Sequence, residues 1–214
     1  MDQEIEIINT NTRIEKIKNY FVENKVKIIS ILGIIFIILI STFFYIDFKK
    51  KGKVKIADRY NFAITKFNSK SYEIALNEFK NLIEIKDKTY SPLSLYFIID
   101  NNLIENETEI NKYFDLIINE IKLDKEIKNL IIFKKALFNS EFETEENLLK
   151  ILYPIINSDS LWKSHALYLM AEYFYSKGEK QKSKEFFNKI IILEKSNPKI
   201  KLESEKRIRR DLSD

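Results

Sequence analysis

The stretch Ile28–Ile46 constrains this chain more than any other feature. It reads IISILGIIFIILISTFFYI, about 19 residues without an ionisable side chain, and Asp47 and a run of lysines end it. As a helix rising ~1.5 Å per residue it is roughly 28 Å long, close to the hydrocarbon thickness of a bilayer. A buried core helix rarely stays apolar on every face for this length, and the pattern lacks the basic start and small-residue cleavage site of a signal peptide. We therefore predict an uncleaved transmembrane helix over residues 28–46.

The flanks of this stretch divide the rest of the chain. We expect residues 1–27 to form an unstructured polar tail, up to about residue 12, and a juxtamembrane amphipathic helix after it. Residues 47–53 are interpreted as a basic linker that contacts anionic lipid headgroups, and residues 54–214 as one repeat domain. Both flanks of the apolar stretch are basic, so the positive-inside rule does not separate the two orientations.

The composition favours an all-α fold and a non-enzymatic protein. The chain has three glycines and three prolines, so few turns need a positive φ and few helices are interrupted. Cysteine is absent and His165 is the single histidine, which excludes disulfides and thiol catalysis and argues against a metal site or a Ser-His-Asp triad. Basic residues are not concentrated as nucleic-acid binding requires. We predict no enzymatic activity, cofactor, metal, small-molecule substrate or nucleic-acid partner.

The apolar spacing after the linker predicts helices that follow one another in pairs. We expect them over residues 54–68, 71–86, 91–104, 108–121, 124–139, 144–157, 160–177, 180–195 and 199–210. A period of roughly 35 residues per pair is typical of an α-solenoid. The predicted fold is therefore a tetratricopeptide-like α-solenoid of about four helix pairs plus a capping helix, behind a single N-terminal transmembrane helix.

Local signals mark the helix ends. The residues suited to an N-cap are Ser71, Asp124 and Thr144, with Ser160 or Asp159 opening the helix over residues 160–177. Pro154 is expected to kink or end its helix. Gly178 is expected to take the left-handed conformation after a helix C-terminus.

The first and last pairs carry the small, small and aromatic residues of the tetratricopeptide pattern. Small residues let two helices approach closely, and the aromatic residue fills the gap to the next helix. The predicted packing residues are Ala63, Ala75, Phe79, Ala171, Ser183 and Phe187, with Trp162 between the third and fourth pairs. The middle pairs match less well, since Ile98 and Ile110 stand where small residues are expected.

The concave face of such an array is formed mainly by the first helix of each pair. Candidate protein-binding residues at equivalent places in the first and last pairs are Tyr60, Ile64, Phe67, Tyr168, Glu172 and Tyr175. Aromatic side chains offer a large contact area at low entropic cost. The alternative is that these rings pack within the solenoid or against the capping helix. Arg207, Arg209 and Arg210 are expected to be solvated.

Residues 13–210 together resemble the YfgM-like family, the ancillary subunits of the SecYEG translocon. The similarity is in the order of the segment IEKIKNYFVENKVKII, one anchor and degenerate repeats, and above all in SDSLWKSHALYLMAEYFYSKGEKQKSKEFFNKIIILE, with Trp162, Ala166, Ala171 and Gly178. The resemblance implies a single-pass protein of the bacterial inner membrane, with a cytoplasmic N-terminus and a periplasmic repeat domain. Its implied partners are translocon subunits, periplasmic chaperones and emerging polypeptides.

Anchor, repeats and resemblance together predict a membrane-anchored scaffold or chaperone-like subunit beside the SecYEG protein-export channel. Its repeat domain would bind partner proteins or emerging chains. The alternative is a cytoplasmic-facing helical-repeat adaptor that assembles another membrane complex.

Overall fold

The computed structural model describes the backbone of residues 2–212 and the side chains of residues 13–212, except those of Ile28, Ile31 and Leu32. Within residues 2–212 every regular element is a helix, and no strand or bridge occurs. The all-α prediction is therefore confirmed. The chain divides into two compact units, Met1–Ile56 and Ala57–Asp214.

The first unit contains α1, Asp2–Glu23, and the beginning of α2, Lys25–Asn68. The prediction of an unstructured tail is wrong, because α1 already begins at Asp2. The residues predicted as a linker, 47–53, lie within α2.

The stretch 28–46 also lies within α2, and its described apolar side chains are exposed. Three of its side chains, those of Ile28, Ile31 and Leu32, lie outside the described residues. Among the side chains that are described, none of the helices combines the length and the apolar character needed to span a bilayer.

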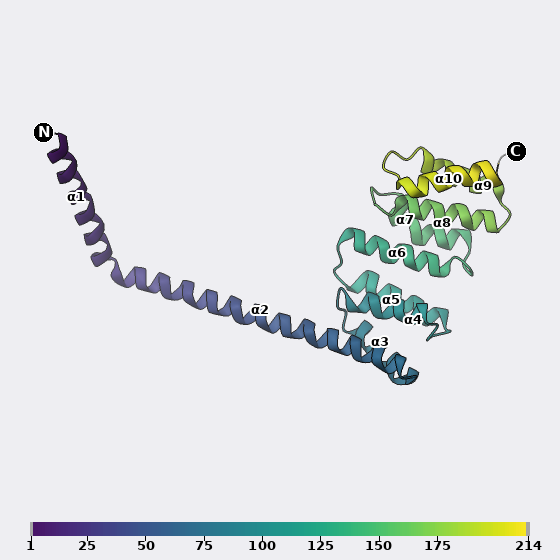
Figure 1. Ribbon diagram of the computed structural model, residues 1–214, viewed down its shortest axis with the longest axis horizontal. Coiled ribbons are helices and arrows are strands. Elements are labelled where there is room, and N and C mark those ends of the chain that lie inside the picture. Colours follow the sequence, from purple (N-terminus) through teal and green to yellow (C-terminus); the bar gives the residue numbers. More distant parts are fainter. Residues whose placement is uncertain (1, 213–214) are drawn as a thin grey trace. The chain divides into compact units, whose positions relative to one another are not determined.

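The second unit is a stack of helix pairs. The end of α2, from Ala57 on, pairs with α3 through the ion pair of Arg59 and Glu78 and the ring contact of Tyr60 and Phe79. The helix α10 follows the last pair, and Figure 1 shows the helices from α3 to α10 succeeding one another in chain order. Their bounds are α3 Tyr72–Glu84, α4 Tyr90–Asp100, α5 Glu107–Glu120, α6 Lys125–Asn139, α7 Glu145–Ile156, α8 Lys163–Ser176, α9 Lys180–Ile191 and α10 Pro198–Asp211. Each helix lies within a few residues of a predicted one, because strong 3.6-residue apolar periodicity marks helices reliably.

The core runs along the stack from pair to pair. One cluster of buried side chains joins α6, α7 and α8, and a second joins α8, α9 and the end of α10. In the second pair, Ile98 and Ile110 are buried where smaller residues were expected. Between pairs, the nearly fully buried Asn139 on α6 exchanges two amide hydrogen bonds of 2.9 Å with Asn111 on α5. This exchange satisfies a polar group that would be costly to bury alone.

The first and last pairs share one turn geometry. Gly178, with φ 79°, follows α8, and Lys70, with φ 62°, takes the same place after α2. In both turns one N–H bonds to the carbonyl five residues earlier, Glu179 to Phe174 and Ser71 to Lys66. This is the Schellman helix ending, which needs a left-handed residue. The expectation for Gly178 is therefore confirmed, and a lysine meets the same requirement in the first pair.

The helix starts were predicted less well. Thr144 accepts a hydrogen bond from the Asn147 N–H and caps α7 as expected. The N-cap position of α8 is Trp162 rather than Ser160. The Ser160 hydroxyl accepts from the Trp162 N–H, and it also donates to Glu126 and accepts from Asn129. Pro154 does not end α7, which continues to Ile156.

All six predicted packing residues of the first and last pairs are fully buried: Ala63, Ala75, Phe79, Ala171, Ser183 and Phe187. Trp162 is partly buried and lies against the cluster of α6, α7 and α8. Where the paired helices meet, alanine leaves no space for a larger residue.

Ala63→Leu and Ala171→Leu are each expected to lower the free energy of unfolding by about 1–3 kcal/mol, because the added carbons must displace packed neighbours. Urea unfolding of the full-length protein in mild detergent, followed by circular dichroism, measures this loss. Ala57→Leu, at a half-buried position of α2, is the matched control. Unchanged stability in both buried variants would contradict the close approach of the paired helices.

Candidate functional site

We call the line of contact between the first helices of two successive pairs a seam. There are four seams, α2–α4, α4–α6, α6–α8 and α8–α10, and in three of them side chains fill the space between the two helices. Ion pairs link second helices instead. The half-buried pair of Lys80 and Glu109, at 2.7 Å, joins α3 and α5, and the exposed pair of Lys182 and Glu145, at 2.8 Å, joins α9 and α7. Such surface pairs contribute little, about 0–1 kcal/mol each. The binding potential of the domain therefore depends on which seam between first helices is open.

Aromatic rings close the α2–α4 seam. Tyr60 lies 5.4 Å from Tyr90 between ring centroids, and Phe67 lies 5.0 Å from Phe97 in an edge-to-face contact. Ile64, between them on the same helix, is half-buried. These three candidate binding residues thus pack inside the domain, which is the alternative that their spacing left open.

A second aromatic group closes the α6–α8 seam. The Trp162 ring stacks on Phe133 of α6 at 5.8 Å, and His165 lies 5.0 Å from Trp162 and 6.0 Å from Phe133. The His165 Nδ1 is buried without a hydrogen-bond partner. Burial lowers the pKa of His165 below its usual 6.5, since the cation would lose water without gaining an anion.

Stability is expected to fall as the pH drops through 6.5 towards the lowered pKa of folded His165. The His165 pKa is lower in the folded than in the unfolded state, so the unfolded chain binds a proton first as the pH passes 6.5. The stabilisation is complete above pH 6.5 and is lost as the pH falls towards the lowered pKa. Urea unfolding monitored by the fluorescence of Trp162, the single tryptophan, measures the slope. His165→Phe, which retains a ring, should flatten it; an equal slope in both proteins would contradict the assignment.

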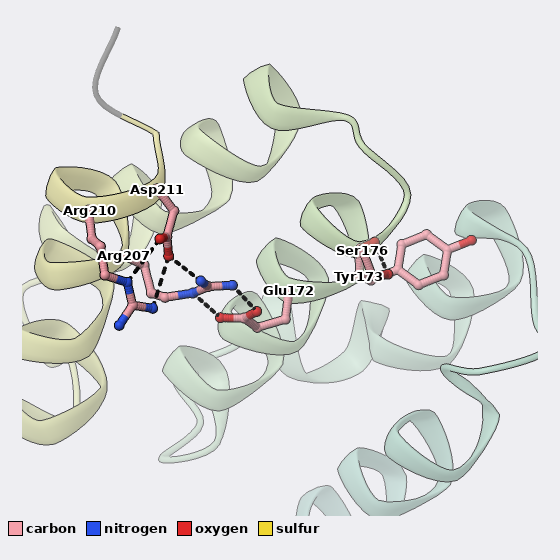
Figure 2. A network of polar contacts seen from close by, with 6 residues as sticks. All are labelled: Glu172, Tyr173, Ser176, Arg207, Arg210 and Asp211. Carbon is pink, nitrogen blue, oxygen red and sulfur yellow. Dashed lines mark hydrogen bonds and ion pairs between the residues drawn. The ribbon is translucent and has the colours of Figure 1, made fainter.

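The α8–α10 seam is closed by Arg207. Its guanidinium donates two hydrogen bonds, of 2.7 and 2.5 Å, to the Glu172 carboxylate on α8 and a third to Asp211 on α10 (Figure 2). The Arg207 Cζ also lies 4.3 Å from the centre of the Tyr175 ring. The expectation that Arg207 is solvated is wrong: its side chain is 13% exposed, because α10 folds back against α8.

The charges of this seam stabilise one another. The hydrogen bonds from Arg210 and Arg207 lower the pKa of Asp211, and those to Glu172 and Asp211 raise the pKa of Arg207. Tyr168, the remaining candidate on α8, packs edge-to-face on Phe187 at 5.4 Å, and burial together with Glu172 raises its pKa to about 12. The candidates on α8 are therefore occupied by neighbours in the same chain.

The α4–α6 seam is open. A cation–π contact crosses it: the Lys134 ammonium of α6 lies 5.6 Å from the centre of the Tyr96 ring on α4. On either side of this contact lie cavities of about 410 Å³ and 130 Å³, and both are lined by Tyr96. The Tyr96 hydroxyl is buried without a hydrogen-bond partner, and burial raises the pKa of Tyr96 to about 12.

Sequence reasoning missed this seam, although one signal pointed to it. The segment YSPLSLYFIID, which forms α4, is apolar on almost every face. A helix of that kind is either surrounded by other elements or exposes an apolar face. Leu93 on α4 and Ile127 on α6 remain 40% and 44% exposed at the mouth of the larger cavity.

The described residues offer geometry for binding rather than for metal chemistry. Among the side chains that the structure describes, no group of three or more His, Cys, Asp or Glu residues is placed to hold a metal ion. What the domain presents is a concave apolar surface with a few polar groups, the usual character of a ligand or peptide site.

No protein-family model matches the chain, and comparisons with curated proteins and with solved structures find no match either.

Proposed function

We propose that this chain is a membrane-anchored, non-enzymatic scaffold or chaperone-like subunit that acts beside the SecYEG protein-export channel. In this proposal it belongs with the YfgM-like subunits that its sequence resembles, residues 28–46 cross the bacterial inner membrane once, and the repeat domain lies in the periplasm. Its partners are translocon subunits, periplasmic chaperones and emerging polypeptides.

The helical continuity of the apolar stretch supports the anchor. Residues 28–46 carry no side chain that is charged at neutral pH and lie inside α2, so their backbone hydrogen bonds are made within the helix, as a lipid environment requires. Ile34, Phe36 and Phe43, for example, are 58–70% exposed. Apolar side chains exposed along a whole helix need an apolar surrounding.

The matching turns support a tetratricopeptide-like solenoid. Besides the Schellman endings, the N-cap residues Ser71 and Glu179 share one backbone conformation, φ −86° and ψ 60° against φ −83° and ψ 63°. The number of residues between Ser71 and Glu179 equals the number between Ala63 and Ala171. Equal geometry at a fixed offset is what a duplicated helix pair produces.

The single observation that carries the binding function is the open α4–α6 seam. The other seams between first helices are filled by packed rings or by Arg207, whereas the α4–α6 seam presents an apolar surface. An anchor keeps such a surface at high effective concentration beside the channel. Weak contacts then suffice to capture a chain or dock a chaperone.

Solubilising the full-length protein from membranes in mild detergent and recovering it by an affinity tag tests the proposal. We expect translocon subunits to copurify, and a variant with Asp at Ile35 and Ile38 to leave the membrane fraction and lose them. Recovery of the intact protein from membranes without any translocon component would contradict the proposed function.

The second candidate, a cytoplasmic-facing adaptor, is favoured by one specific observation. Lys49, Lys50, Lys51, Lys53 and Lys55 are exposed on α2 directly after the apolar stretch, and excess lysine marks the cytoplasmic side of a span. Protease added to spheroplasts digests a periplasmic domain and spares a cytoplasmic one. Protection of the repeat domain would therefore select the adaptor.

A further inference from the structure

The open seam is part of a longer groove that runs between α4 and α6. Beyond the cavities at Tyr96 lies a third, of about 540 Å³, which shares Ile99, Leu137 and Phe138 with its neighbour. The groove follows α4, whose 11 residues span about 16 Å. That length accommodates about five residues of an extended peptide.

Apolar side chains line the groove at both of its ends. Leu93 and Ile127 are exposed at the end where the helices begin, and Leu137 and Phe142 are 45% and 41% exposed at the end where they stop. Between them lies the Tyr96 ring, which lines both of the cavities beside it.

The two ends of the groove differ in charge. Asp100, Glu105, Glu107 and Glu141 are all exposed at the end formed by the α4–α5 turn and the end of α6, and none makes an ion pair among the described residues. Lys134 is the one cation that lines this end. At the opposite end Lys88 and Asp124 offset each other.

We propose that this groove binds a peptide segment whose apolar side chains lie on α4 and α6 and whose adjacent lysines or arginines lie at the acidic end. The proposal rests on the partner-binding function and names its ligand class. The apolar floor supplies affinity through burial. The acidic end fixes the direction of the segment and rejects segments that end in acids, since like charges side by side are unfavourable.

Fluorescence anisotropy with the full-length protein in lipid nanodiscs tests this inference. The probe is a labelled peptide of about eight residues, with five apolar residues followed by Lys-Lys-Arg, compared with the same peptide ending in Glu-Glu-Glu. We expect the basic peptide to bind at least tenfold more tightly. Equal binding of the two peptides would overturn the proposal.

Paired variants locate the site. The double variant Glu105→Lys, Glu141→Lys should weaken binding of the basic peptide at least tenfold and strengthen binding of the acidic one. The control, Glu73→Lys with Glu185→Lys, makes an equal charge change at exposed positions elsewhere and should leave the binding of both peptides unchanged. Binding of the basic peptide that survives the groove variants would overturn the inference.

The remaining outcomes separate this inference from the proposed function. Copurification of translocon subunits without peptide binding would refute the groove and leave the function standing. Peptide binding with the expected charge preference, but without copurification of translocon subunits, would support the groove and refute the proposed function. Sedimentation tests whether a second copy of the chain occupies the groove instead. A concentration-dependent dimer that is lost in Leu93→Asp would show this and overturn the proposal of a peptide ligand.

Discussion

Replacing Phe79 with alanine is expected to lower the free energy of unfolding by about 3–5 kcal/mol, the usual loss for a fully buried phenylalanine. Phe79 is 0% exposed, stacks on Phe97 with 4.4 Å between ring centroids and meets the edge of Tyr60 at 5.7 Å. Because Phe97 belongs to the next pair, the cavity left by alanine removes contacts inside the first pair and between the first two pairs.

Phe62→Ala provides the matched control for this substitution. Phe62 lies on α2 within the same unit, is 47% exposed, and contacts mainly the Lys66 ammonium, 5.1 Å from its ring centre. Surface changes of this kind usually stay within about 0.5 kcal/mol. Urea midpoints of the full-length variants in mild detergent compare the two. Equal midpoints would show that Phe79 is not in the core of the first pair.

Replacing Arg207 with methionine is expected to cost about 1.5–3 kcal/mol. Methionine retains much of the aliphatic stem but loses the two hydrogen bonds to Glu172 and the contact with the Tyr175 ring. Hydrogen bonds to charged groups contribute more than neutral ones, and loss of one partner leaves the other desolvated. The loss should appear as detachment of α10, seen as faster hydrogen exchange in residues 198–211.

A double-mutant cycle with Glu172→Gln isolates this pair. We expect the double variant to lose less than the sum of the single losses, because each single change already breaks the ion pair between Arg207 and Glu172. Lys195→Met, which breaks the ion pair with Asp159, is the control: both side chains are more than 75% exposed, and no measurable change is expected. Additive losses would show that Arg207 and Glu172 stabilise the fold independently.

The helices were predictable because their periodicity is a property of each segment alone. Residues 108–121 were predicted and α5 runs Glu107–Glu120, since Ile110, Phe114 and Ile117 form one buried stripe. The N-cap role of Thr144 was predictable for the same reason, because an N-cap side chain bonds to the backbone of the helical turn that directly follows it. Ser160 was not, since its hydroxyl bonds to Glu126 and Asn129, more than thirty residues away.

The open site was not predictable from spacing, because availability depends on the neighbouring helix. Tyr60 and Tyr96 both lie on first helices, yet Tyr90 covers the first, and the second lies beside an open cavity. Glu172 and Tyr175 had suitable positions for a ligand, but Arg207 fills the seam. A sequence shows which side of a helix is apolar, whereas only the packed array shows which seam remains uncovered.

The neighbour-by-neighbour stack also determines how this domain acquires its structure. From α3 onward, each helix contacts mainly the one or two that precede or follow it. Folding then closes short loops rather than long ones, which makes it rapid, and it can begin at any pair and spread. A chain built in this way forms one pair at a time as it is synthesised, so each finished pair serves as the surface on which the next one condenses.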